Sequence, residues 1–188
     1  MQPLSRCAWP TNTLDTQYHD EEWGVPLYED QRLFELLILE GVQAGLSWST
    51  VLKRRAAYQE LYDNFDPAVV ATYTAQKIDD LLANPRLIRN TLKIRASVKN
   101  AQAFNRVQKE FGSFSNYLWR FVDKQPIINH WASSQQIPSQ TKLSSRLSSD
   151  LKTKGFSFVG PTICYAFMQA SGLVNDHLIS CFRHSEVQ

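Results

Sequence analysis

The segment GPTICYAFMQASGLVNDHLISC, residues 160–181, contains a strong helix signal with a defined start and a defined end. Gly160 followed by Pro161 is typical of a helix start, because proline suits the first helical position. Gly172 is typical of a helix end, because glycine adopts the left-handed conformation without strain. We therefore predict a helix from Pro161 through TICYAFMQAS, with polar residues that can carry chemistry directly after it.

Two candidate metal ligands follow this helix, and two more lie near the other end of the chain. His177 and Cys181 are four residues apart, so on a helix both side chains would leave the same face and reach one ion. Cys7 and His19 form the second pair. When all four ligands of a tetrahedral zinc are protein atoms, no position stays open for water or substrate. The pairs predict a structural zinc that joins residues 7–23 to residues 172–181.

Two other interpretations of these residues stay open at this point. In the first interpretation the four residues are ordinary buried side chains, since the motif is split and lacks CxxC spacing. In the second, Cys7 and Cys181 form a disulfide. The N-terminal residues MQPLSRCAWP contain no apolar signal region, so we expect a cytoplasmic protein, in whose reducing environment a structural disulfide is disfavoured.

The composition is that of a chain that folds around its own core. Its 188 residues are 43% hydrophobic and 12% aromatic, which suits one domain spanning residues 1–188, or two helical lobes sharing a cleft. Glu35 and Glu40 interrupt the most apolar stretch, so we expect no membrane span. A net charge of +2 identifies no partner by itself, and a monomer is the default expectation.

The sequence reads as helical almost throughout, and we predict an all-α fold. Expected helix caps are Asp30, Ser47 (for a helix running to about Tyr62), Asp66 with Pro67 after it, Thr74 and Ser113. The segment RLIRN, residues 86–90, precedes a long helical pattern over residues 91–111, and the two are predicted to form a helix–turn–helix hairpin.

This hairpin lies in a stretch without acidic residues. Between Asp80 and Glu110 the only charged residues are basic, and they include Arg86, Arg89 and Lys93. Such a stretch creates a positive field able to attract a nucleic-acid backbone. The alternative is a solvated helix face.

Glu40 is the most informative polar residue, because helical spacing places it at the end of the apolar stripe of Leu33, Leu36 and Leu37. A carboxylate there is costly to desolvate, so it has either a function or a partner at a helix junction. Nearby in the sequence are Gln43, Leu46 and Trp48, and the N-terminal segment contributes Trp9, Tyr18 and Trp23. These residues are the parts of a base-binding pocket, in which rings stack on a heterocycle and a carboxylate accepts its hydrogen bonds. An aromatic core cluster is the alternative.

Four segments closely resemble the 3-methyladenine DNA glycosylase I family, from about Cys7 to Cys181. They are CAW at residue 7, YHDEEWGVP from residue 18, LEGVQAGLSWSTVLKRR from residue 39 and GFSFVGPTICYAFMQASGLVNDH from residue 155. The resemblance implies a helix–hairpin–helix glycosylase fold and a monofunctional enzyme. Such an enzyme hydrolyses the N-glycosidic bond of N3-methyladenine in alkylated double-stranded DNA and so begins base excision repair.

The resemblance also assigns roles to residues. It implies structural zinc bound by Cys7, His19, His177 and Cys181, and Glu40 as the catalytic and base-recognising carboxylate. It implies Trp9, Tyr18 and Trp48 as further substrate-binding residues, and Arg86, Arg89 and Lys93 as DNA contacts within the hairpin. The hairpin lacks the glycines of many such hairpins.

One position departs from the family pattern. Asp15 stands where a pocket tyrosine is expected, and we predict that Asp15→Tyr raises the affinity for 3-methyladenine. The rival hypothesis is a zinc-stapled DNA-binding protein of the same fold with weak or no excision. Retention of Glu40 and Trp48 argues against this rival, and a four-ligand site argues against a zinc hydrolase.

Overall fold

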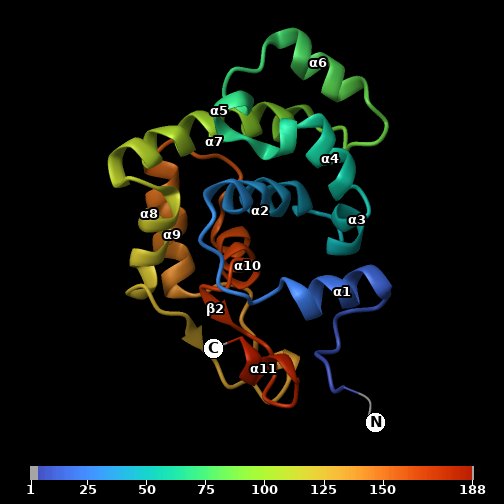
Figure 1. The fold of residues 1–188 in the computed structure, drawn as a ribbon, viewed down its shortest axis with the longest axis vertical. Helices are drawn as coiled ribbons and strands as arrows, with labels where there is room; N and C mark the ends of the chain where they lie inside the picture. The colour runs from blue at the N-terminus through green and yellow to red at the C-terminus, as the bar shows by residue number, and fades with distance from the viewer. Residues whose placement is uncertain (1–3, 188) are drawn as a thin grey trace.

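The computed structural model describes residues 4–187, which form helices joined by short loops (Figure 1). In chain order the elements are α1 (Thr13–Glu21), α2 (Asp30–Gln43), α3 (Trp48–Leu52), α4 (Arg55–Leu61), η1 (Asp63–Phe65), α5 (Pro67–Val70), α6 (Ala75–Ala83), α7 (Thr91–Phe111), α8 (Phe114–Trp119), η2 (Arg120–Val122), β1 (Ile127–Ile128), η3 (Ser134–Gln136), α9 (Lys142–Thr153), α10 (Pro161–Ala170), β2 (Val174–Asn175) and α11 (Arg183–Glu186). The two-residue strands β1 and β2 pair in parallel. The helical prediction is confirmed, with this short pairing as an addition.

Helix α2 is the centre of the core. Every residue from Leu33 to Val42 is buried, because LFELLILEGV is apolar on nearly all sides of the helix. Helices α7, α8, α10 and α3 contact it, and Figure 1 shows α2 between α7 and α10. Glu40 is therefore carried into the interior by the helix on which the fold is built.

Most predicted caps are confirmed. The side chains of Ser47, Asp66, Thr74 and Ser113 each accept a hydrogen bond from an amide of the helix that follows. The helix after Ser47 is shorter than predicted, because the amide of Arg54 bonds to the carbonyl of Val51 in a tighter turn that separates α3 from α4.

The predicted cap at Asp30 is wrong. Asp30 is the first residue of α2, and its carboxylate accepts hydrogen bonds from the amides of Phe114 and Ser115, both at 2.8 Å. It therefore satisfies the N-terminus of α8, far away in the sequence, which local pattern cannot reveal.

A helical hairpin is present, but the prediction that RLIRN forms its first arm is wrong. Helices α6 and α7 are its two arms, and RLIRN lies in the turn between them. The side chain of Asn84 accepts a hydrogen bond from the amide of Arg86 at 3.0 Å, which folds the chain back at this point.

Gly172 brings the end of α10 against the segment after α1. Its φ is +71°, and a Cβ atom there would lie 2.4 Å from the backbone of Val25 and Pro26. The amide of Gly24 bonds to the carbonyl of Gln169 at 3.1 Å, and the amide of Leu27 bonds to the carbonyl of Ser171 at 3.1 Å. This close approach, which only glycine permits, places the N-terminal segment beside the residues that follow α10.

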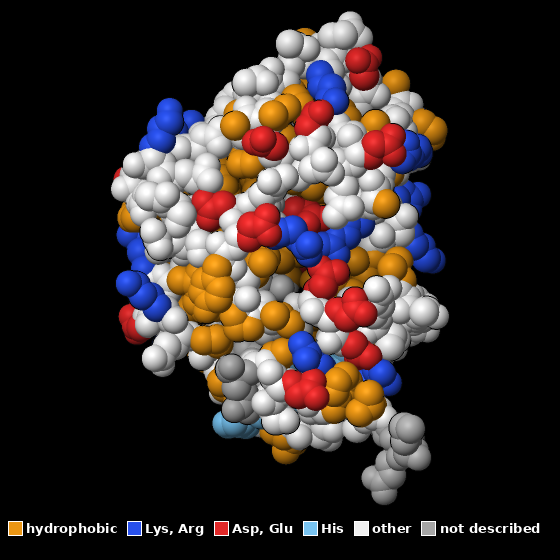
Figure 2. All heavy atoms as spheres, viewed as in Figure 1, with side chains coloured by type: hydrophobic (Ala, Val, Ile, Leu, Met, Phe, Trp, Pro, Cys, Tyr) orange, Lys and Arg blue, Asp and Glu red, His pale blue; other side chains and the backbone are white. Residues whose placement is uncertain are grey.

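Charged side chains of both signs are mixed over the face shown in Figure 2, in keeping with the small net charge. In the described part of the chain, each helix is either too short or too polar to cross a membrane.

Candidate functional site

Cys7, His19, His177 and Cys181 converge into one buried cluster. Their ligand atoms all lie within 4.8 Å of one another. The Sγ of Cys181 is 3.5 Å from His19 Nε2 and 3.5 Å from His177 Nδ1, and Cys7 Sγ is 3.7 Å from His177 Nδ1. Bond lengths typical of zinc in a tetrahedral site place S and N ligands about 3.6 Å apart. The cluster can thus hold a metal ion, and no position is left for a substrate.

The side chains of the cluster are not joined by a disulfide, and their chemistry suits metal binding. All three cysteines are free, so Cys7 and Cys181 are not joined by a disulfide. Burial lowers the pKa of His177 to about 4, which keeps its imidazole neutral and able to ligate. Burial raises the pKa of the Cys7 thiol to about 12, so a thiolate there requires a cation to compensate it.

A second layer of hydrogen bonds orients the two imidazoles. His19 Nδ1 lies 2.7 Å from the carboxylate of Asp20, which Arg6 holds through two nitrogens. His177 Nε2 bonds to the carbonyl of Trp23 at 2.9 Å. The other nitrogen of each ring therefore faces the cluster, an arrangement typical of metal-binding histidines.

The helical spacing that suggested His177 and Cys181 is not the reason they meet. Residues 177–181 form an irregular segment, with the amide of Cys181 bonded to the carbonyl of Leu178 at 2.8 Å. The prediction of convergence holds although its geometric argument was wrong.

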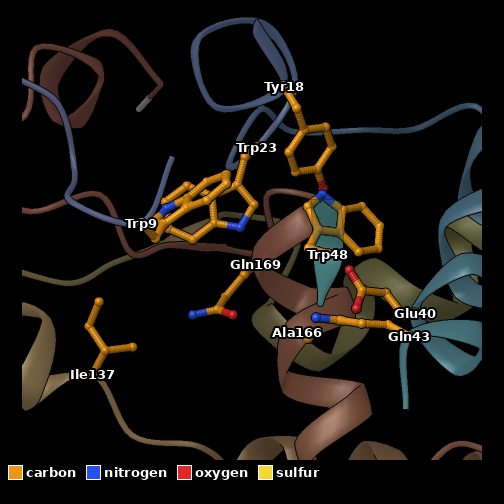
Figure 3. Close-up of a pocket in the computed structure, with 9 residues that line it drawn as sticks. All are labelled: Trp9, Tyr18, Trp23, Glu40, Gln43, Trp48, Ile137, Ala166 and Gln169. Atoms are coloured by element: carbon orange, nitrogen blue, oxygen red, sulfur yellow. The ribbon is translucent and has the colours of Figure 1, made fainter. Parts of the chain in front are cut away.

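Next to this cluster lies a cavity of about 240 Å³, which we call the base pocket (Figure 3). Its lining combines rings with a few polar groups: Trp9, Tyr18, Trp23, Glu40, Gln43, Trp48, Ile137, Ala166 and Gln169. The residues come from four separate parts of the chain: the N-terminal segment, the α2–α3 region, the loop after η3 and α10. The pocket is therefore a product of the tertiary fold.

The aromatic walls are held by ring contacts. Trp9 and Trp23 meet edge to face at 5.4 Å, and Tyr18 packs against Trp48 at 5.2 Å. In Figure 3 the two pairs lie apart, Gln169 and Ala166 lie below them in this view, and Glu40 lies below Trp48. This spacing leaves ring faces and edges available to a flat ligand.

Glu40 is the charged group that sequence reasoning placed here, and the structure puts it in the pocket lining at 4% exposure. Burial raises the pKa of its carboxyl group to about 8. Its Oε2 atom is buried without a hydrogen-bond partner. Burial therefore favours the neutral form of this acid, and its Oε2 atom has an unused bonding position.

Three further polar atoms of the pocket share this property. Among the described residues, the buried side-chain atoms without a hydrogen-bond partner include Trp9 Nε1, Tyr18 OH and Trp48 Nε1. Buried polar groups in folded proteins are nearly always paired. Four such groups on residues that line one cavity make it the candidate site for a ligand.

The metal cluster and the base pocket share a wall. The ring of His177 lies 4.6 Å from that of Trp23, and the ring of His19 lies 5.5 Å from that of Trp9. Two pocket rings are thus packed directly on two candidate metal ligands.

Asp15 does not line the pocket, although the family resemblance places it at the position of a pocket tyrosine. Its carboxylate is buried at 3% exposure and accepts hydrogen bonds from Ser49 at 2.6 Å, Asn12 at 2.8 Å and Thr11 at 3.1 Å. Through Ser49 it ties α1 to α3. A tyrosine at residue 15 would break these bonds, and Asp15 is not among the residues that line the pocket. That Asp15→Tyr raises the affinity for 3-methyladenine stays a prediction.

The three predicted DNA contacts have different surroundings. Arg89 is exposed at the hairpin turn, whereas Arg86 is paired with Glu60 at 2.9 Å. Lys93 Nζ donates to the carbonyls of Val42 and Ala44 at 2.7 and 2.6 Å, so it caps the C-terminus of α2. Of the three, Arg89 has the position expected of a phosphate contact.

Sequence reasoning missed Ile137, Ala166 and Gln169 in the lining. Gln169 had a signal, since it is a glutamine near the end of the otherwise apolar helix α10. Ile137 lies in a loop with no periodic pattern, and nothing in the sequence marked it.

Comparison with known proteins agrees with this geometry. The family model described as methyladenine glycosylase matches residues 9–184. A DNA-3-methyladenine glycosylase from Haemophilus influenzae is 47% identical over 178 residues, covering 94% of this chain and 96% of that protein. DNA-3-methyladenine glycosylase 1 from Escherichia coli K12 is 44% identical, covering 95% and 96%.

Solved structures extend the likeness to the whole fold. A crystal structure of 3-methyladenine DNA glycosylase I superposes with a TM-score of 0.92 at 47% identity, covering 95% of this chain and 98% of that one. A 3-methyladenine DNA glycosylase I from Staphylococcus aureus, studied for its recognition of 3-methyladenine, gives 0.92 at 38% identity, with 95% and 96% covered. The chain belongs to the 3-methyladenine DNA glycosylase I family.

Proposed function

We propose that this DNA-3-methyladenine glycosylase holds the extruded 3-methyladenine in the base pocket, with Glu40 as the residue that recognises it. The observation that carries the proposal is the set of four buried, unpartnered polar atoms on Trp9, Tyr18, Glu40 and Trp48. No other group of the described protein pairs with these atoms. Their hydrogen-bonding capacity is therefore available to a base, because buried polar groups are normally paired.

The aromatic residues supply the rest of the binding energy. A base leaves the duplex stack at a cost of a few kcal/mol, which stacking in the pocket offsets in part. Stacking on an aromatic ring is worth roughly 1–3 kcal/mol per base. Tyr18 and Trp48 provide one aromatic wall, and Trp9 with Trp23 provides the other.

Glu40 favours a cationic base over a neutral one. N3-methylated adenine in DNA carries a positive charge, and a cation in the pocket stabilises the carboxylate form that burial alone disfavours. The proton leaves Glu40 as the cation enters, and the resulting pair lies in a low-dielectric site where electrostatics are strong. An uncharged normal purine gains no such electrostatic attraction to the Glu40 carboxylate.

The charge of the base also makes it a good leaving group. The bond from the sugar carbon to the base breaks with its electron pair going to the base, which becomes neutral, and water then adds to the sugar. Of the described residues, those that line the pocket include no lysine, so the pocket offers no amine nucleophile for a covalent sugar intermediate. This supports a monofunctional glycosylase.

We propose zinc as the metal of the Cys7, His19, His177 and Cys181 cluster. Two sulfur and two nitrogen donors at tetrahedral separations are the donor set that zinc prefers. When bound, the ion would fix the termini and the wall formed by Trp9 and Trp23. It takes no part in breaking the glycosidic bond.

Double-stranded DNA would approach along the hairpin. Arg89 at the turn is proposed as a phosphate contact, with Arg86 able to exchange Glu60 for a phosphate. Lys93 is proposed to act by fixing the end of α2, and hence Gln43 in the pocket. We further propose that the protein acts as a cytoplasmic monomer.

The experiment is to incubate the purified protein with methylated duplex DNA and identify the released bases by chromatography. We expect release of 3-methyladenine by the wild type and a rate reduced about 100-fold in Glu40→Gln. Glu110→Gln is the matched control, since it makes the same change at an exposed position and should leave the rate unchanged.

If the wild type releases no base but still binds the DNA, the alternative of a zinc-stapled DNA-binding protein replaces this proposal. Equal release by wild type and Glu40→Gln would remove Glu40 from its role.

A further inference from the structure

Asp176 is a buried carboxylate that the proposed chemistry does not use. It is 0% exposed and follows β2 directly. Four side-chain donors converge on it: Asn129 at 2.7 Å and Trp131 at 2.8 Å on Oδ1, and Tyr165 at 2.6 Å and Gln169 at 2.8 Å on Oδ2. A carboxylate this deeply buried is tolerated because donors replace the water that it loses.

One of these donors, Gln169, also lines the base pocket. Its Nε2 is bound to Asp176 Oδ2, and a carboxylate can only accept, so this contact fixes which end of the amide is nitrogen. The amide oxygen is therefore the end left for a ligand. In Figure 3 this oxygen lies on the side of Gln169 toward Gln43 and Glu40, and the nitrogen lies on the opposite side.

An acceptor with a fixed orientation discriminates between purines. Adenine carries an exocyclic amino group that donates hydrogen bonds, whereas guanine carries an oxygen acceptor at the same ring position. Opposite the oxygen of Gln169, an amino group forms a hydrogen bond, while an oxo group faces a second acceptor. A site built to bind one polar group rejects the analogue that lacks it far more strongly than an apolar wall can.

We propose that Gln169 is a specificity-determining residue that accepts a hydrogen bond from the exocyclic amino group of the flipped base, and that Asp176 is the positioning residue that fixes its amide. This inference rests on the proposed base pocket and deepens it. The amino group has two hydrogens, so Glu40 and Gln169 can both bind it. The rings and Glu40 favour a cationic purine. Gln169 selects the purine that carries an amino group and not an oxo group at this ring position.

The test is a fluorescence titration of the purified protein with free 3-methyladenine and free 3-methylguanine. We expect the wild type to prefer 3-methyladenine. Gln169→Met keeps the length of the side chain and removes the acceptor, so the ratio of the two affinities should fall about tenfold. Asp176→Asn should lower the same ratio, because the amide of Gln169 can then turn either end to the pocket.

Tyr165→Phe is the matched control. It removes another donor from the same oxygen of Asp176 but leaves Gln169 bonded. We expect a lower melting temperature and an unchanged affinity ratio. If Asp176→Asn does not fold, Gln169→Met alone decides the matter, since Gln169 lies at the surface of the cavity.

The outcomes separate this inference from the proposal beneath it. If the wild type binds neither base, or Glu40→Gln binds both equally well, the base pocket itself is misassigned. If Glu40→Gln weakens binding while Gln169→Met and Asp176→Asn keep the wild-type ratio, the base pocket stands and the role of Gln169 is refuted.

Discussion

The metal cluster and the base pocket are built from the same N-terminal segment, yet they treat their polar atoms in opposite ways. In the metal cluster the four ligand atoms of Cys7, His19, His177 and Cys181 face one another, and outer hydrogen bonds hold both imidazoles. In the base pocket, four of the lining residues carry a buried polar atom that has no hydrogen-bond partner in the described protein. A site whose groups satisfy one another around an ion serves stability, and a site with unsatisfied groups serves binding.

The shared wall links the two. Trp9 and Trp23 line the base pocket and pack on His19 and His177. We therefore expect substitutions in the metal cluster to disturb the base pocket as well. Substitutions in the base pocket should leave the metal cluster intact.

Loss of a metal ligand should have the largest effect. Cys181→Ser should lower the free energy of unfolding by on the order of 5 kcal/mol, because the termini lose their link and buried polar groups lose their partner. Denaturant unfolding, with zinc content measured by atomic absorption, checks this. Cys164→Ser is the control, since Cys164 is a buried cysteine outside the cluster and should keep one zinc per chain. Equal zinc content in Cys181→Ser and Cys164→Ser would contradict the assignment of Cys181 as a ligand.

The pH dependence of stability should separate Glu40 from an ordinary surface acid. Burial raises the pKa of its carboxyl group from the ordinary value of 4.5 to about 8, so the folded state binds the proton more tightly. Its stabilisation is complete below about pH 4.5 and is lost as the pH rises to about 8. Relative to Glu40→Gln, the wild type should lose on the order of 4 kcal/mol over this range. Urea unfolding at several pH values measures it, and parallel curves for the two proteins would contradict it.

Removal of an aromatic wall should affect binding but not the metal. Trp48→Ala should weaken binding of 3-methyladenine by roughly 1–3 kcal/mol, with zinc content unchanged. Trp48→Phe retains a ring and should lose less. Fluorescence titration gives the affinities. Loss of zinc in Trp48→Ala would show that damage to the base pocket also reaches the metal cluster, contrary to expectation.

The smallest effect is expected at the hairpin. Arg89→Ala should weaken binding to duplex DNA and reduce the slope of its salt dependence by about one, with no change in affinity for the free base. Arg86→Ala should do less, because the guanidinium is already shared with Glu60. Anisotropy titrations at several salt concentrations distinguish the two, and identical slopes for wild type and Arg89→Ala would exclude the phosphate contact.

Local features of the fold were predictable from the sequence, and long-range ones were not. Ser47, Asp66, Thr74 and Ser113 cap helices as expected, since a cap depends on residues two or three positions away. Asp30 has the same local signature, but its carboxylate caps α8, a partner that appears only once α2 and α8 pack together.

The candidate site shows the same division. Glu40 was found because a carboxylate on the apolar face of a helix violates the pattern. Gln169 was missed because its proposed role depends on Asp176, which binds its amide through a contact made only in the fold. Asp15 was expected at a pocket position, whereas its carboxylate accepts hydrogen bonds from Ser49, Asn12 and Thr11, which position in the sequence does not show.

The most direct test of the central claim, that Glu40 recognises the base in a preorganised pocket, is a calorimetric titration of 3-methyladenine into the wild type and Glu40→Gln at one pH. The account predicts binding to the wild type and at least tenfold weaker binding to Glu40→Gln, with the zinc content of the two proteins equal. Equal affinity of the two proteins for the base would contradict it.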